Sequence, residues 1–185
     1  MKIKTVGPNG RVVSFIDIGT NSVRLLVVRL NPNHSYSILT QQKQQVRLGE
    51  GEFEDEEILP EAIERLVVVC KKLTELARSF QTDEFVAVAT SAMREAANQH
   101  DILHLIRQEA MVDVRVISGH EEARLTYLGV VSGIHLDDRQ AFFIDIGGGS
   151  TEIVVGDEQN YHYLDSFKLG AIRLSNLYFS ADITE

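Results

Sequence analysis

Apolar and β-branched residues gather in short runs at the start of the chain. Residues 12–18 are mostly of this kind, which is typical of a strand buried on both faces. The same signal resumes over 23–30 after a Gly-Thr-Asn-Ser turn, and residues 35–48 alternate more loosely. The pattern therefore predicts an opening meander of three strands.

Helical periodicity follows in the middle of the chain. After Pro60, a residue tolerated in a first helical turn, apolar positions recur every three or four residues and predict an amphipathic helix of about 20 residues. The segments predicted after it are a strand over 84–89, helices over 90–97 and 101–110, a strand over 112–117, a helix over 118–131, strands over 141–146, 151–156 and 161–169, and the start of a helix over 173–179. Strands that alternate with crossover helices predict a layered α/β fold.

An internal repeat divides the chain. Residues 15–28 read FIDIGTNSVRLLVV and residues 143–156 read FIDIGGGSTEIVVG, with seven identities in fourteen at an offset of 128. Two matching strand–turn–strand units indicate a duplication. We therefore expect one complete domain over residues 1–138 and the opening β-meander of a second, truncated domain over 139–185.

Each copy of the repeat carries the same candidate chemistry. A strand ends in an aspartate, Asp17 or Asp145, and a glycine-containing turn and a serine follow. Glycine permits tight turns and close approach of a ligand, and successive turn N–H groups can bind phosphate oxygens. Carboxylates at strand ends can hold Mg²⁺ directly or through water. Two such hairpins facing each other would form a phosphate clamp.

Most of the net negative charge of the chain comes from one segment. The chain has 27 acidic and 18 basic residues and a net charge of −9, which disfavours nucleic acid or an anionic membrane as a partner. Eight of the acids lie between Glu50 and Glu64, where there is no basic residue. The acidity thus belongs mainly to the start of the long helix, where it suits the helix dipole.

Other features exclude several classes of protein. The single cysteine, Cys70, excludes an internal disulfide and a cysteine-based zinc site. No apolar run approaches the ~20 residues that span a bilayer, and Asp17 interrupts the N-terminal segment before a secretory signal could develop. We expect a cytoplasmic protein.

His100 and His104 have the spacing of one helical face but no evident third metal ligand, and an exposed polar face is the alternative to a metal site.

Four motifs follow one another along the chain: DIGTNS at 17–22 with Arg24, TSAMR at 90–94, SGHEEARL at 118–125 and DIGGGSTE at 145–152. In this order they resemble those of the exopolyphosphatase/guanosine pentaphosphate phosphatase (Ppx/GppA) family, within the actin-like, sugar-kinase and chaperone ATPase superfamily. The resemblance implies an α/β, ribonuclease H-like domain with a mixed five-stranded sheet and flanking helices, plus the start of a second, duplicated domain. It leaves room for a homodimer of the full-length protein.

The resemblance also implies an activity. The terminal phosphate of inorganic polyphosphate or guanosine pentaphosphate would be hydrolysed in an interdomain cleft with a divalent metal, Mg²⁺ or Mn²⁺. The family's catalytic carboxylate falls on Glu122. The residues expected at the phosphates are Gly19, Thr20, Asn21, Ser22, Arg24, Arg94, Gly147, Gly148, Gly149 and Ser150, and those expected at the metal are Asp17, Asp145 and Glu152.

Spacing separates the two neighbouring glutamates. Ser118 and Glu121 have capping-box spacing, in which the serine hydroxyl caps the helix and the glutamate reaches back to the serine N–H. Glu122 lies about 100° further around the helix, close to its N-terminus, and can act on a water molecule. Arg94 is the best cationic contact, because guanidinium matches phosphate oxygens bidentately. Arg24 could equally be a surface residue.

Two other functions stay open. One is a non-catalytic sensor that binds guanosine tetra- or pentaphosphate, and the other is an ATP-dependent kinase of the same superfamily. The motif at 118–125 favours the phosphatase, and the sequence does not separate its two substrates. Gly170 and Arg173 also fit the family's pattern, without an assigned role.

Overall fold

The first strand is the centre of a mixed sheet. In the computed structural model, which describes residues 10–50, 57–137 and 139–179, β1 (Arg11–Ile18) pairs antiparallel with β2 (Ser22–Leu30) and parallel with β4 (Glu84–Ala89). β3 (Tyr36–Gln45) and β5 (Val114–Val116) complete the order β3-β2-β1-β4-β5. This is the mixed five-stranded sheet that the sequence predicts. The N-terminal residues 1–9, and residues 51–56 of the acidic segment, lie outside the described part.

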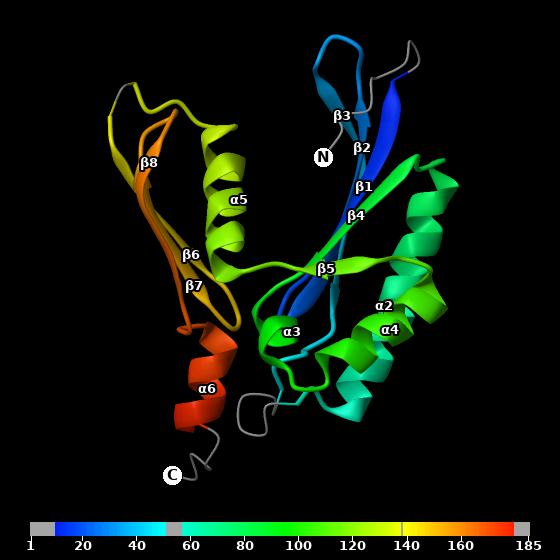
Figure 1. The fold of residues 1–185 in the computed structure, drawn as a ribbon. Helices are drawn as coiled ribbons and strands as arrows, with labels where there is room; N and C mark the ends of the chain where they lie inside the picture. Colours follow the sequence, from blue (N-terminus) through cyan, green and yellow to red (C-terminus); the bar gives the residue numbers. More distant parts are fainter. Residues whose placement is uncertain (1–9, 51–56, 138, 180–185) are drawn as a thin grey trace.

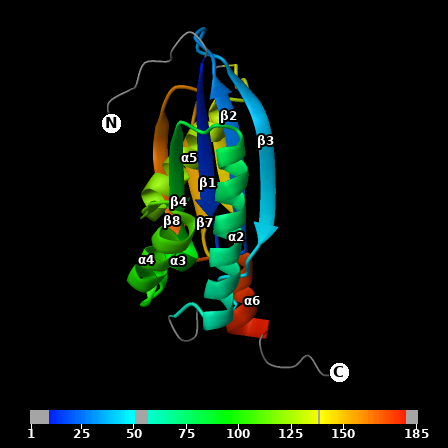
Figure 2. The ribbon, with the colours of Figure 1, turned by 90° about the vertical axis from the view of Figure 1, so that its right-hand side faces the viewer.

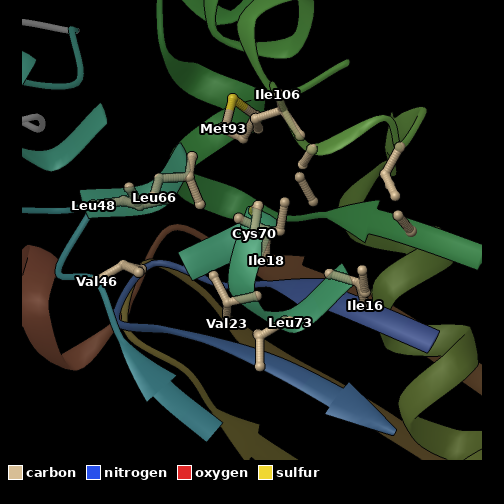
Figure 3. Close-up of a cluster of buried hydrophobic side chains, with 14 of the residues drawn as sticks. Ile16, Ile18, Val23, Val46, Leu48, Leu66, Cys70, Leu73, Met93 and Ile106 are labelled. Carbon is tan, nitrogen blue, oxygen red and sulfur yellow. The ribbon is translucent and has the colours of Figure 1, made fainter. Parts of the chain in front are cut away.

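Two helices cover one face of this sheet, as Figures 1 and 2 show: α2 (Pro60–Ser79) and α4 (Gln99–Ala110). The long helix starts at Pro60 as predicted. Its apolar stripe packs on β1 side chains such as Ile16 and Ile18 (Figure 3). The short helix α3 (Ser91–Glu95) follows β4 directly and adds the buried Met93. A single core therefore fixes the carboxyl end of β1, where Asp17 lies.

A second, smaller sheet lies beside the first (Figure 1). It consists of β6 (Ala141–Ile146), β7 (Thr151–Gly156) and β8 (Tyr161–Phe167) in antiparallel order, and α6 (Ala171–Phe179) follows it. Helix α5 (Gly119–Val131) packs on this sheet through a small core of Ala123, Tyr127, Phe143 and Val154. The helix that precedes position 138, the expected end of the first domain, thus packs against the second sheet. Residue 138 itself is outside the described part, and the domain boundary stays a prediction.

The duplication predicted from the sequence is visible in the strand register. Asp17 faces Arg24 across β1 and β2, and at the same offset Asp145 faces Glu152 across β6 and β7. Both turns close with the same backbone bond, from the Gly19 amide to the Ser22 carbonyl (3.0 Å) and from the Gly147 amide to the Ser150 carbonyl (2.9 Å). The register shift at 27/28 recurs at 155/156. The two hairpins are therefore equivalent in backbone geometry as well as in sequence.

Some elements begin or end elsewhere than expected. β3 stops at Gln45 because the amides of Val46 and Arg47 turn to donate to the Asn21 carbonyl, at 2.9 and 3.0 Å. α6 begins at Ala171 instead of 173, since its first amides bond to the glycine turn of the second hairpin. Among the residues that the structure describes, none of the helices combines the length and apolar character needed to cross a bilayer.

The packing of α2 predicts a sharp contrast between two of its residues. Leu66 is fully buried in the main core, whereas Val68 is 66% exposed. Leu66→Ala should lower the free energy of unfolding by about 2–5 kcal/mol, because the cavity left behind collapses only partly. Val68→Ala should change it by less than about 0.5 kcal/mol. Urea unfolding followed by circular dichroism measures both, and equal effects would contradict the assigned packing.

Candidate active site

The two glycine turns meet at the junction of the two sheets. A Cβ atom added to Gly148 would lie 3.0 Å from the Thr20 Cβ, and one added to Gly149 would lie 2.5 Å from the Ser91 Oγ and 2.7 Å from the Thr20 Oγ1. The contacts at Gly149 are too close for any side chain, and the contact at Gly148 is tighter than most Cβ contacts. The turn at 147–150 therefore approaches Thr20 and Ser91 this closely only because these positions are glycine.

A cavity of about 360 Å³ opens at this junction. Its walls come from both hairpins, from α5 and from the first residues of α6. The expected site residues that line it are Asp17, Gly19, Thr20, Asn21, Ser22, Arg24, Glu122, Asp145, Gly147, Gly148, Gly149, Ser150 and Glu152. Thr90 and Ser91 of the TSAMR motif line it as well, and so does Lys43, which the sequence did not single out. Arg94 is not among the lining residues.

Carboxylates of the cavity influence one another. Burial raises the pKa of the Asp17 carboxyl, and the nearby charge of Asp145 raises it further, while Arg24 opposes both effects. Glu152 is buried at 3% exposure and accepts a hydrogen bond from the Ser166 hydroxyl at 2.8 Å. Negative charge is thus concentrated in the cavity.

Helix α5 brings its second glutamate into the cavity. The Ser118 Oγ accepts a hydrogen bond from the Glu121 amide at 3.1 Å, which confirms the predicted N-cap. The Glu121 side chain does not return to the Ser118 amide as a capping box would require. It accepts two hydrogen bonds from the Arg115 guanidinium instead, at 2.8 and 3.0 Å, and these lower its pKa. Glu121 is therefore held by a neighbouring strand, outside the cavity that Glu122 lines.

The environment of Glu122 suits proton transfer near neutral pH. Burial raises the pKa of its carboxyl to about 7; the charges of Glu152 and Asp17 also raise it, whereas Arg94 lowers it. The Arg94 guanidinium donates to the Glu122 carboxylate at 3.0 Å and to the Ile117 carbonyl at 3.0 Å. Arg94 thus orients Glu122 in this structure, and its contact to phosphate stays a prediction.

The oxygen ligands in the cavity fit a hard divalent cation in part. Within the described ranges, no three His, Cys, Asp or Glu side chains already lie close enough to hold a metal ion by themselves. Asp17, Asp145, Glu122 and Glu152 nevertheless line one cavity beside the two glycine turns. Mg²⁺ commonly takes one or two carboxylates and completes its coordination with water and substrate phosphates. The residues present fit a cation bound together with a phosphate chain.

Helix α6 supports the second turn from its carbonyl side. The amides of Ala171 and Ile172 donate to the carbonyls of Gly147 and Gly148, both at 2.9 Å. Gly170 leaves no room for a side chain, because an added Cβ would collide with the Gly148 backbone. The close approach explains the glycine of the LGAIRL segment, for which the sequence alone provided no role.

A family model and several curated proteins match this chain. The model of the Ppx/GppA phosphatase family matches residues 26–185. Exopolyphosphatase 1 of Mycobacterium tuberculosis is 31% identical over 167 residues, which are 90% of this chain and 48% of that protein. The bifunctional 3-dehydroquinate synthase/phosphatase of Fusobacterium nucleatum is 32% identical over 171 residues, 89% of this chain and 26% of that protein. The chain thus spans from about a quarter to about half of these curated relatives.

Solved structures show the same fold. An exopolyphosphatase from Cytophaga hutchinsonii superposes with a TM-score of 0.88 at 30% identity, covering 91% of this chain and 54% of that one. The Aquifex aeolicus PPX-GPPA enzyme superposes with a TM-score of 0.77 at 31% identity, covering 93% and 57%. The ribonuclease H-like, actin-like architecture expected from the motifs is therefore confirmed.

Two glycines of α5 provide a matched test of the site geometry. A Cβ added to Gly119 would lie 2.6 Å from the Ser166 Cβ, so Gly119→Ala must push the first turn of α5, which carries Glu122, away from β8. We expect it to lower the free energy of unfolding by about 1–3 kcal/mol. Gly129→Ala meets no atom within 4 Å and should stabilise the protein by up to about 1 kcal/mol. Urea unfolding distinguishes them, and a shift of the same sign in both variants would refute the close packing.

Proposed function

This chain belongs to the Ppx/GppA phosphatase family, and we propose that it provides the catalytic cleft of a phosphoanhydride hydrolase acting on the terminal phosphate of inorganic polyphosphate. The observation that supports this most is the cavity itself, which combines two glycine turns, the carboxylate Glu122 and further acidic residues between the two sheets. Guanosine pentaphosphate is the second substrate we propose, since it also ends in a phosphoanhydride-linked phosphate.

In the proposed reaction, water attacks the terminal phosphorus in line with the bridging oxygen. Glu122 accepts the proton as the new P–O bond forms, the bridging P–O bond breaks, and the shortened chain leaves with the electron pair on its terminal oxygen. The reaction requires little covalent chemistry from the protein, so positioning and charge neutralisation dominate. A pKa of about 7 lets Glu122 accept a proton and release it again near neutrality.

The two turns would hold the non-bridging phosphate oxygens. The proposed donors are the Ser22 and Ser150 hydroxyls and the backbone amides of 19–22 and 147–150, except those of Gly19 and Gly147, which close the two turns. Both turns line the cavity. Arg24 lines the cavity too and supplies positive charge there. Arg94 would act through Glu122, because its guanidinium donates a hydrogen bond to the Glu122 carboxylate at 3.0 Å and orients it.

A divalent cation is part of the proposal. Asp17, Asp145 and Glu152 would hold Mg²⁺ or Mn²⁺, whose charge offsets that of the phosphate chain. The same acids explain why phosphate needs such a cation here: without one, several carboxylates would face a polyanion at short range. The cytoplasmic location and the homodimer of a full-length protein stay predictions.

One assay distinguishes this function from the alternatives. The 185-residue chain is incubated with Mg²⁺ and with polyphosphate, guanosine pentaphosphate or ATP plus candidate acceptors, while released phosphate and acceptor transfer are measured. We expect phosphate release from polyphosphate without an acceptor. Binding without release would indicate a sensor, and acceptor-dependent transfer would indicate a kinase.

Adjacent glutamates allow a controlled test of the base. Glu122→Gln should lower the turnover of polyphosphate about 10²–10⁴-fold, because the amide cannot accept a proton from water. Its affinity for the substrate should change much less. Glu121→Gln, one residue away and paired with Arg115, should keep turnover within about threefold. Near-normal turnover in the Glu122 variant, or an equal loss in both, would refute the assignment.

A further inference from the structure

One buried cation, Arg173, connects the turn at 147–150 to α3, beside the five-stranded sheet. The Arg173 side chain, on α6, is only 10% exposed. Its Nε donates to the Gly149 carbonyl at 2.8 Å, and its Nη2 lies 2.6 Å from the Glu95 carboxylate and 3.4 Å from the Ser91 hydroxyl. Glu95 and Ser91 belong to α3, at the end of the five-stranded sheet. A single guanidinium therefore joins the turn to the opposite side of the cavity.

Its partner Glu95 is held ionised. Burial alone would raise the pKa of the Glu95 carboxyl, but Lys168 and Arg173 together hold that pKa below its usual range. The two cations are not equivalent, because the Lys168 side chain is 74% exposed whereas Arg173 is 10% exposed. Solvent screens the lysine pair, at 2.7 Å, much more than the arginine pair. Arg173 is therefore the buried counter-charge of Glu95, and Lys168 is the exposed one.

The network lies in the wall of the cavity. Ser91 lines the cavity, donates to the Glu95 carboxylate at 3.1 Å, and is the residue that an added Cβ on Gly149 would strike. Ser91, Glu95 and Arg173 thus connect at the point where the two turns are closest. Removal of the guanidinium would leave a charged carboxylate without its buried partner and the Gly149 carbonyl without its donor.

We propose that Arg173 is a positioning residue, whose buried ion pair with Glu95 fixes the separation of the two phosphate-binding turns. It acts through Gly149 and α3 and does not itself contact the reacting phosphate. The consequence for phosphate affinity rests on the proposed function. The effect on the separation of the two units does not.

Spin labels can measure that separation directly. Val68, which is 66% exposed on α2, and Tyr163, which is 46% exposed on β8, are replaced by cysteine and labelled. Cys70 can stay, because burial raises the pKa of its thiol to about 12 and keeps it unreactive at neutral pH. The distance distribution between the labels is recorded by pulsed electron spin resonance in the otherwise unchanged chain and in Arg173→Gln. We expect a broader or longer distribution in the variant.

The exposed cation Lys168 provides the matched control. Lys168→Gln removes the other partner of Glu95 and should leave the distribution unchanged. Arg173→Lys keeps the charge without the guanidinium geometry and should give an intermediate width, which keeps the test decisive if Arg173→Gln unfolds. Glu95→Gln should broaden the distribution as Arg173→Gln does, and the double variant should add little to either single one.

Affinity for inorganic tripolyphosphate is the functional readout, measured by titration calorimetry with Mg²⁺. Arg173→Gln should weaken binding at least about tenfold, and Lys168→Gln less than about twofold. An unchanged distance distribution in folded Arg173→Gln or Arg173→Lys would overturn the proposal, even where affinity falls, because Arg173 would then act on the ligand directly. A changed distribution in a protein that binds no tripolyphosphate would support the positioning role and refute the proposed function instead.

Discussion

The close approach of the second glycine turn to the first unit is the constraint on which the site depends. No side chain fits at Gly149, because Ser91 and Thr20 already occupy the space, and a side chain at Gly148 would press against Thr20. α6 then fills the carbonyl side of the turn, and Gly170 is needed for that contact as well. The second turn is thus packed on both sides, against Thr20 and Ser91 on one side and against α6 on the other, and this packing sets the size of the cavity.

The electrostatics of the cavity follow from this geometry. Two equivalent hairpins each place an aspartate at the end of a strand, and α5 adds Glu122 close to Glu152. Burial raises the pKa values of Asp17 and Glu122, and like charges at short range raise them further. The net charge of −9 is therefore no argument against phosphate chemistry, because backbone amides, a cation and a few arginines can bind phosphate in an acidic protein.

Much of the fold and of the candidate site could be predicted from the sequence, because the sequence patterns that mark them are local or repeated. The β-branched runs, Pro60 and the Ser118 cap predicted their elements, and the repeat predicted two matching hairpins. The motifs predicted which residues would gather, and nearly all of them line one cavity.

What could not be predicted depends on contacts between distant residues. Arg173 and Glu95 are 78 positions apart, and no local pattern marks them as partners. Glu121 has capping-box spacing, but Arg115 competes for its carboxylate with a charged, bidentate contact that is stronger than one neutral amide. Arg94 likewise pairs with Glu122, which a motif cannot reveal because only the fold brings the two side chains together.

The central claim is that both glycine turns bind one phosphate chain. Amide resonances of the ¹⁵N-labelled chain, followed by nuclear magnetic resonance during titration with inorganic tripolyphosphate and Mg²⁺, test it most directly. The account predicts that the largest shifts fall in residues 19–22 and 147–150 and that both turns saturate at the same ligand concentration. Shifts confined to one turn, or a different midpoint for each, would contradict it.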